Sequence, residues 1–259
     1  MKNLLIYISP TGSFDNPRTD LASNDAGPLA KVQIENSLQL GWKPEDILLV
    51  TNFPFQYGKI KALEITDVEF FDRKPQVSKI NAIIKLIENG IITGNELYWF
   101  HDFDAFQQEW ITDEEITVNE GELGVTEYGG LYFAGQKRIS TGVLYFRAST
   151  LALLCSIKEK AYELKIDEEE ALGLLMKEST DVKKQVVILN HTYNFIGYSL
   201  SSTYKKTRKP IKVVHFHPLV GKRKLHTDNA LRFFRGDNPL KIPLVSDKVV
   251  KLLKYHRLA

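Results

Sequence analysis

Apolar and polar positions along the first half of the chain fall into blocks that predict strands followed by helices. Residues 4–9 form a nearly continuous apolar run, as expected of a strand that is covered on both faces. Ile80, Ile83, Ile84 and Ile87 follow the spacing of one helix face and predict a helix over residues 75–88. Strands that alternate with helices of this length favour βαβ units and a mostly parallel sheet.

The remaining elements are predicted from the same two periodicities. Further strands are expected over residues 46–51, 96–100, 124–126, 131–133, 139–146, 186–189 and 212–216. Further helices are expected over residues 28–41, 150–164, 168–177 and 248–257. No linker interrupts the pattern, so we expect one domain over residues 1–259, with a basic helical extension from about residue 225.

Composition excludes several classes of protein. A single cysteine, Cys155, excludes an internal disulfide framework and any multi-cysteine zinc or iron–sulfur site. The 34 basic and 32 acidic residues nearly balance, so a nucleic-acid partner is not expected. The N-terminal apolar run predicts a first strand rather than a signal peptide, and no run approaches the length of a membrane span. The expected compartment is therefore the cytoplasm.

Basic residues gather toward the C-terminus. Residues 205–224 contain many Lys and Arg residues and no Asp or Glu, and residues 248–257 predict a basic amphipathic helix. A solvated helix face is the favoured interpretation. Peripheral contact with an anionic membrane surface is the alternative.

Asp102-Phe103-Asp104 follows the apolar strand at residues 96–100. In open α/β sheets, ligands bind beyond the carboxyl ends of the strands. Two carboxylates at such a place can converge on Mg²⁺ or Mn²⁺, which prefer oxygen ligands and often share them with phosphates. Exposed turn aspartates are the alternative. A haloacid-dehalogenase-like phosphatase is disfavoured, because Phe106 stands where such enzymes carry Thr or Val.

Three later motifs could contribute to the same site. Thr141-Gly142 begins a strand at a small residue, which permits either close approach of a ligand or a strand bend. Glu168 and Glu169 precede an apolar helix. Their carboxylates could contact a ligand, or they could stabilise the N-terminus of that helix. The strand near residue 215 ends in His215 and His217, ahead of Lys222.

Taken in order, these motifs resemble family eight of the GT-A glycosyltransferases, the glycogenin and galactosyltransferase group. The resembling segments are residues 27–38, 102–104, 140–143, 168–172, 193–195 and 215–222. The first loop, the acidic segment and the spacing after His215 depart from the family pattern. The resemblance implies an α/β, GT-A fold with a mostly parallel sheet flanked by helices. It also implies a hexosyltransferase that uses a nucleoside-diphosphate sugar, a UDP-sugar, with retention of configuration.

The resemblance assigns roles to individual residues. Mn²⁺ or Mg²⁺ would be held by Asp102, Asp104 and either His215 or His217, with Lys222 neutralising phosphate charge. The nucleotide would lie near the ends of the first two strands, at Ile8, Ser9, Thr11 and Asn52. The donor would also contact Asp102, Lys79, Thr141 and Gly142. Glu168 or Glu169 would contact the sugar or the acceptor, or serve as general base in an inverting reaction.

Two other classes of function remain open at this point. A non-catalytic nucleotide-sugar-binding module would bind the donor without turnover, since a fold does not fix a function. A metal-dependent nuclease or nucleotidyltransferase would need further acidic ligands near the aspartate pair. The acceptor of a transferase would be a glycan, a protein or a lipid-linked sugar.

Overall fold

The computed structural model describes residues 1–9, 26–133, 136–196, 200–215 and 244–258, together with Gly236 and Lys241. The strands of the main sheet are β1 (Lys2–Tyr7), β2 (Ile47–Thr51), β5 (Leu63–Glu64), β6 (Tyr98–His101), β8 (Leu123–Phe133), β9 (Gln136–Phe146) and β10 (Val186–Ile188). Shorter strands are β3 (Gln56–Tyr57), β4 (Ile60–Lys61), β7 (Ala105–Gln107), β11 (Phe195–Ile196) and β12 (Val213–His215). The helices are α1 (Ala26–Gln39), α2 (Ser78–Glu88), α3 (Leu151–Leu164), α4 (Glu168–Glu178), α5 (Thr180–Gln185), α6 (Leu200–Lys206) and α8 (Asp247–Tyr255).

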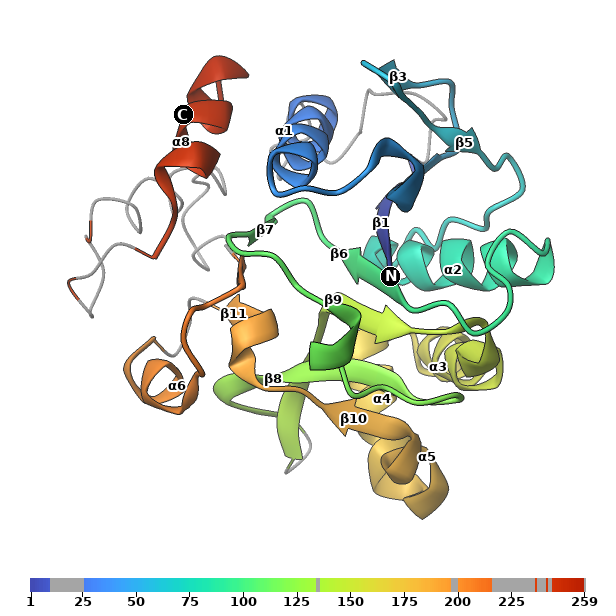
Figure 1. Ribbon diagram of the computed structural model, residues 1–259. Coiled ribbons are helices and arrows are strands. Elements are labelled where there is room, and N and C mark those ends of the chain that lie inside the picture. The colour runs from blue at the N-terminus through green and yellow to red at the C-terminus, as the bar shows by residue number, and fades with distance from the viewer. Residues whose placement is uncertain are drawn as a thin grey trace.

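The main sheet has the strand order β10-β8-β9-β6-β1-β2-β5 (Figure 1). Strands β5, β2, β1 and β6 run parallel, and β9 runs antiparallel between β6 and β8. A second sheet has the strand order β11-β12-β7, and its strand β7 directly follows β6 along the chain. The α/β class and the mostly parallel sheet predicted from the sequence are therefore confirmed.

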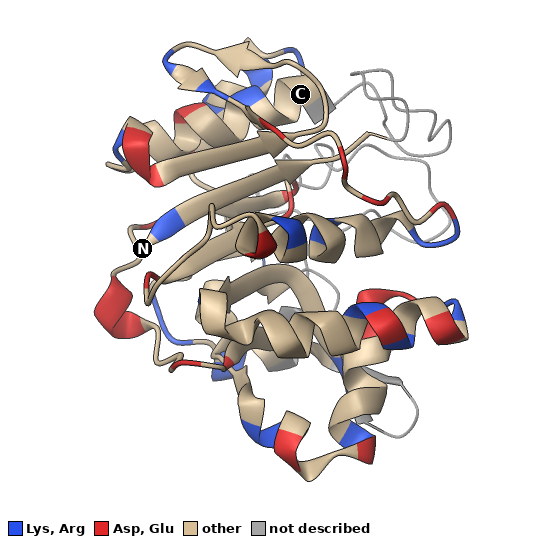
Figure 2. Cartoon of the chain, turned by 90° about the vertical axis from the view of Figure 1, so that its right-hand side faces the viewer, with Lys and Arg blue, Asp and Glu red and all other residues tan. Residues whose placement is uncertain are grey.

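The central strands are apolar on both sides because helices cover both faces of the sheet. Leu4 and Phe100 point into a core with α2, α3 and α4. Their neighbours Leu5 and Trp99 point the other way, into a core with α1. Figure 2 shows the strands almost without Lys, Arg, Asp or Glu, which lie instead on the helices and connecting loops. Two-sided burial explains why these strands appear in the sequence as continuous apolar runs.

The region between residues 123 and 133 corrects the sequence prediction. Two short strands were expected over residues 124–126 and 131–133, but the chain forms one strand, β8, paired with β9. The register of this pair shifts between Glu127 and Tyr132, where Gly129 and Gly130 lie. Glycine weakens a strand but suits a bulge, so the pair of glycines bends β8 without ending it.

The C-terminal helix is amphipathic, as predicted. Val249, Leu252 and Leu253 of α8 are buried, whereas Lys248, Lys251 and Lys254 are exposed. The buried face packs on α1 beside Leu29 and Val32. No helix within the described ranges is long and apolar enough to cross a membrane. The role of the basic face, and the division into one domain with an extension, stay predictions.

Truncation inside the core of α3 tests the packing of the main sheet. Leu154 is fully buried, so Leu154→Ala removes apolar contacts and leaves a cavity. We expect the free energy of unfolding to fall by about 2–5 kcal/mol in urea denaturation. Leu164→Ala, in the same helix, removes a side chain that is 44% exposed and should change it by less than about 0.5 kcal/mol. Equal losses in the two variants would contradict the described packing.

Candidate functional site

The two aspartates lie on a turn that joins β6 to β7. The Ala105 nitrogen donates a hydrogen bond to the Asp102 oxygen, 3.0 Å away, which closes the turn. From α1, the buried Gln33 amide donates to the Phe103 oxygen at 2.7 Å and to the Ala105 oxygen at 3.2 Å. Because Gln33 binds the carbonyl groups of the residues before and after Asp104, the backbone conformation is fixed on both sides of Asp104.

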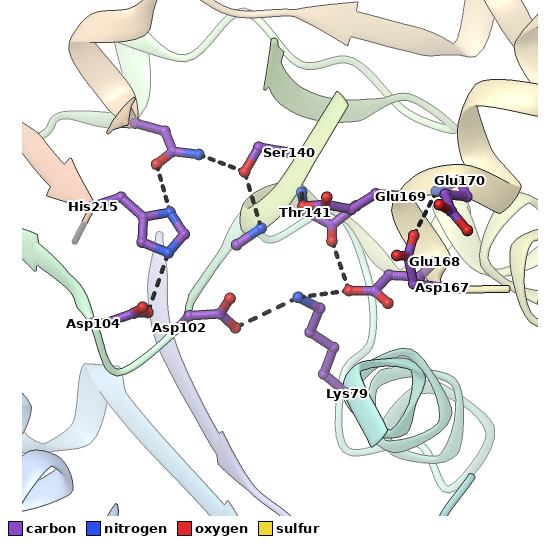
Figure 3. A network of polar contacts seen from close by, with 12 residues as sticks. Lys79, Asp102, Asp104, Ser140, Thr141, Asp167, Glu168, Glu169, Glu170 and His215 are labelled. Atoms are coloured by element: carbon purple, nitrogen blue, oxygen red, sulfur yellow. Dashed lines mark hydrogen bonds and ion pairs between the residues drawn. The ribbon is translucent and has the colours of Figure 1, made fainter. Parts of the chain in front are cut away.

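His215 reaches the same turn from a distant part of the chain. Strand β12 pairs antiparallel with β7 and places His215 opposite Ala105. His215 is fully buried, and its Nε2 lies 3.1 Å from Asp104 Oδ1. One ligand atom from each of Asp102, Asp104 and His215 lies within 4.8 Å of the others. Figure 3 shows the three side chains around one point at the end of β6.

This donor set suits a divalent cation. Carboxylates favour Mg²⁺ and Mn²⁺, and an imidazole nitrogen moves the preference toward transition metals such as Mn²⁺. Burial raises the pKa of Asp102, and the neighbouring Asp104 raises it further. Burial lowers the pKa of His215, but the Asp104 carboxylate outweighs it, so the net pKa of His215 is raised. The carboxylates of Asp102 and Asp104 thus repel each other, and a bound cation would offset this repulsion.

The absence of a side chain at Gly142 leaves room for the ring of His215. The Asp102 nitrogen donates to the Gly142 oxygen at 2.8 Å, which holds β9 against the turn. A Cβ at Gly142 would lie 2.2 Å from His215 Cε1 and 3.0 Å from Asp102 Oδ2. The sequence predicted either close approach of a ligand or a strand bend at this glycine, and the structure shows that the imidazole of His215 approaches here.

Lys79 connects the aspartate turn with the acidic start of α4. Its Nζ lies 2.9 Å from Glu168 Oε1 and 3.5 Å from Asp102 Oδ1 (Figure 3). Burial lowers the pKa of Lys79, but the surrounding carboxylates, led by Asp102, raise it overall, so the amine stays charged. Burial raises the pKa of Glu168, yet Lys79 outweighs it and the net pKa is lowered. This pair is therefore ionised at neutral pH.

Glu168 and Glu169 occupy different environments. Thr141 Oγ1 donates to Glu168 Oε1 at 2.9 Å, while Glu168 Oε2 is buried with no hydrogen-bond partner among the described residues. Glu169 accepts hydrogen bonds from the Thr141 nitrogen, the Tyr128 hydroxyl and Arg138 Nε, at 3.1, 3.0 and 3.1 Å. Glu168 thus extends toward Lys79 and Asp102, whereas Glu169 is occupied in holding β9.

The structure brings together seven of the residues that the sequence singled out: Lys79, Asp102, Asp104, Thr141, Gly142, Glu168 and His215. Ser9 and Asn52 lie at the ends of β1 and β2, where Asn52 Oδ1 accepts from the Ser9 nitrogen at 2.9 Å and its Nδ2 donates to the Ser9 oxygen at 2.6 Å. Ile8 precedes this pair. Thr11, His217 and Lys222 lie outside the described residues. Contact with the nucleotide or its phosphates by Ile8, Ser9, Thr11, Asn52 and Lys222 stays a prediction, as does metal binding by His217.

Two residues at the site were not given a role from the sequence. Gln33 supports the aspartate turn, and Asn194 contacts His215 through its Oδ1, which lies 3.1 Å from His215 Nδ1. Gln33 could have been noticed as a polar residue on the apolar side of a predicted helix. Asn194 lies in the segment 193–195 that contributed to the family resemblance, but nothing in the sequence connects it to a particular partner.

Ionisation of Glu169 predicts a pH dependence of stability. Burial and the nearby Glu168 carboxylate raise the pKa of Glu169 from 4.5 to about 7. Between these values the folded protein holds a proton that the unfolded chain has lost, so stability falls as the pH rises. The contribution is on the order of 3 kcal/mol. Glu169→Gln should flatten the slope of unfolding free energy between pH 5 and pH 7, measured in urea, and an unchanged slope would contradict the assignment.

A methyl group at Gly142 tests the packing of His215. Gly142→Ala places a Cβ 2.2 Å from the imidazole and should lower the free energy of unfolding by about 1–3 kcal/mol. Gly173 in α4 faces open space, so Gly173→Ala should raise it by up to about 1 kcal/mol through helix propensity. Urea denaturation of both variants measures this contrast, and a stabilised Gly142→Ala would disprove the contact.

Comparison with known proteins relates this geometry to one group of folds. No protein-family model and no curated protein sequence matches the chain. A glycosyltransferase involved in glycosylation of the major capsid of PBCV-1 superposes with a TM-score of 0.53 at 11% identity, covering 86% of this chain and 97% of its own. The galactosyltransferase LgtC, solved with donor and acceptor sugar analogues, gives 0.52 at 13% identity, covering 84% and 87%. The glycosyltransferase GlyE of Streptococcus pneumoniae TIGR4 gives 0.53 at 11% identity, covering 84% and 55%.

These similarities extend over most of the chain. Identities of this size support a common fold and leave membership of family eight a prediction. The chain therefore has the GT-A glycosyltransferase fold that the order of its motifs predicts.

Proposed function

We propose that the protein is a metal-dependent glycosyltransferase that transfers a sugar from a nucleoside-diphosphate sugar. The observation that carries this proposal is the convergence of Asp102, Asp104 and His215 at the carboxyl end of β6, within a GT-A fold. Ligands of open α/β sheets bind at this end of the strands. A triplet of hard and borderline ligands there fits a cation that is shared with a diphosphate.

Asp102, Asp104 and His215 would hold Mn²⁺ or Mg²⁺. Such a cation neutralises charge on a phosphate oxygen and stabilises the diphosphate as a leaving group. Lys79 is a second source of positive charge beside Asp102, since it is buried and ionised. Lys222, outside the described residues, is proposed to contact the same phosphates.

The donor sugar is proposed to lie between the aspartate turn and α4. Glu168 Oε2 is a buried acceptor without a described partner, so it is available to a sugar hydroxyl. Thr141 Oγ1 and Lys79 already hold the other oxygen of Glu168, which fixes the direction of this acceptor. Glu168 is therefore the proposed sugar-contacting carboxylate, and Glu169 the residue that orients Thr141.

The nucleotide is proposed to lie beyond β1 and β2, near Ile8, Ser9, Thr11 and Asn52. UDP as the carrier and retention of anomeric configuration follow from the resemblance to family eight. The acceptor is proposed to be a glycan, a protein or a lipid-linked sugar. The exposed lysines of α8 are proposed to form a solvated helix face, with contact to an anionic membrane surface as the alternative.

Binding of UDP with and without Mn²⁺ tests the proposal. Asp104→Asn removes one ligand charge, and we expect it to weaken Mn²⁺-dependent UDP binding at least about tenfold in isothermal titration calorimetry. Asp181→Asn is the matched control, because Asp181 is 91% exposed and lies in α5, outside the candidate cation site. It should bind as the unmodified protein does.

Three outcomes would contradict parts of the proposal. Equal UDP affinity in Asp104→Asn and the unmodified protein would remove Asp104 from the metal site. Tight donor binding without hydrolysis or transfer, over a panel of sugars and acceptors, would favour a non-catalytic binding module. Metal-dependent cleavage of DNA or RNA would favour a nuclease.

A further inference from the structure

The buried imidazole of His215 lies between two polar partners. Its Nε2 lies 3.1 Å from Asp104 Oδ1, and its Nδ1 lies 3.1 Å from Asn194 Oδ1. The ring is fully buried and lies against Gly142, where no side chain could fit. Because the ring lies against Gly142, it has little room to flip about its Cβ–Cγ bond, a motion that would replace each nitrogen by a ring carbon.

The amide of Asn194 has a defined orientation. Asn194 is fully buried, and its Nδ2 donates to Thr126 Oγ1 at 2.9 Å and to Ser140 Oγ at 3.1 Å. These hydroxyls belong to β8 and β9, so the amide nitrogen is directed at the main sheet. Its oxygen is then directed at His215, on β12 of the second sheet.

An amide oxygen accepts hydrogen bonds and cannot donate them. Its contact with His215 Nδ1 therefore requires a proton on Nδ1. A histidine that binds a cation is neutral and carries one proton, so with that proton on Nδ1 its Nε2 offers the lone pair. This is the nitrogen that lies beside Asp104, one of the two carboxylates that form the candidate cation site with His215.

We propose that Asn194 is a positioning residue that holds His215 in the tautomer with its proton on Nδ1, so that Nε2 is the nitrogen offered to the cation. The proposal rests on the proposed metal site. Asn194 does not touch the cation in this arrangement; it acts through His215. Thr126 and Ser140 accept hydrogen bonds from the amide nitrogen of Asn194, so the amide oxygen is the end that faces the ring.

Two substitutions at Asn194 separate the acceptor from the bulk of the side chain. Asn194→Leu removes the acceptor at similar volume and should weaken binding of Mn²⁺ alone by about 10- to 100-fold. Asn194→Asp keeps an acceptor opposite Nδ1, and the hydroxyls of Thr126 and Ser140 can rotate to donate to it. This variant should bind Mn²⁺ within about threefold of the unmodified protein, or more tightly. Equal binding by Asn194→Leu and the unmodified protein would overturn the proposal.

A spectroscopic measurement tests the tautomer without any substitution. Long-range ¹H–¹⁵N correlation spectra of histidine-labelled protein, saturated with diamagnetic Mg²⁺, distinguish a protonated Nδ1 from a protonated Nε2. We expect His215, assigned by its absence in His215→Ala, to carry the proton on Nδ1. A proton on Nε2 would overturn the proposal. A residue that only fills space would not determine this signature.

Calorimetry of His215→Ala with Mn²⁺ separates this inference from the function on which it rests. If His215→Ala binds Mn²⁺ as the unmodified protein does, the metal site itself is misassigned and the proposal falls with it. If His215→Ala loses binding while Asn194→Leu retains it, the metal site stands and the role of Asn194 is wrong. Loss in both variants, with retention in Asn194→Asp, supports both assignments.

Discussion

The site depends on one backbone hydrogen bond, from the Asp102 nitrogen to the Gly142 oxygen. It extends the antiparallel pairing of β6 and β9 by one step beyond His101 and Val143. Since β9 is fixed at that register, Thr141 faces the start of α4, where it contacts Glu168 and Glu169. A shift by one residue would turn every side chain of β9 to the other face of the sheet. It would also place a side chain where the imidazole of His215 now lies.

Periodicity predicted the long elements well, because each buries an apolar face against the sheet. The four isoleucines of α2 are an example, since Ile80, Ile83 and Ile84 are buried as the spacing requires. Short elements such as β7, β11 and the β3–β4 hairpin were not predicted. The three-residue strands β10 and β12 lie in apolar runs and were predicted, but the missed strands carry too little pattern, and their pairing depends on other segments of the chain. The continuity of β8 was missed for a related reason. The sequence does not show that β9 pairs with β8 on both sides of Gly129 and Gly130, and without that pairing two glycines suggest the end of a strand.

The sequence singled out the residues that form the candidate cation site, Asp102, Asp104 and His215, but not the residues that support them. Aspartates after an apolar strand, and a histidine that ends another, are visible as residue types that suit a cation. The direction of a side chain is not visible, and this is why Glu168 and Glu169 could not be told apart. Gln33 and Asn194 act on other protein groups rather than on a ligand. Buried amides of this kind have no signature until their partners are placed in space.

The contact between Asp104 and His215 joins residues 111 positions apart, and this separation has a consequence for biosynthesis. All seven strands of the main sheet are present once the chain has been made as far as Ile188. His215, and the helix α8 that packs on α1, are added only later. On the ribosome, every strand of the main sheet is therefore synthesised before His215, and the candidate cation site is completed only by a residue that is added later.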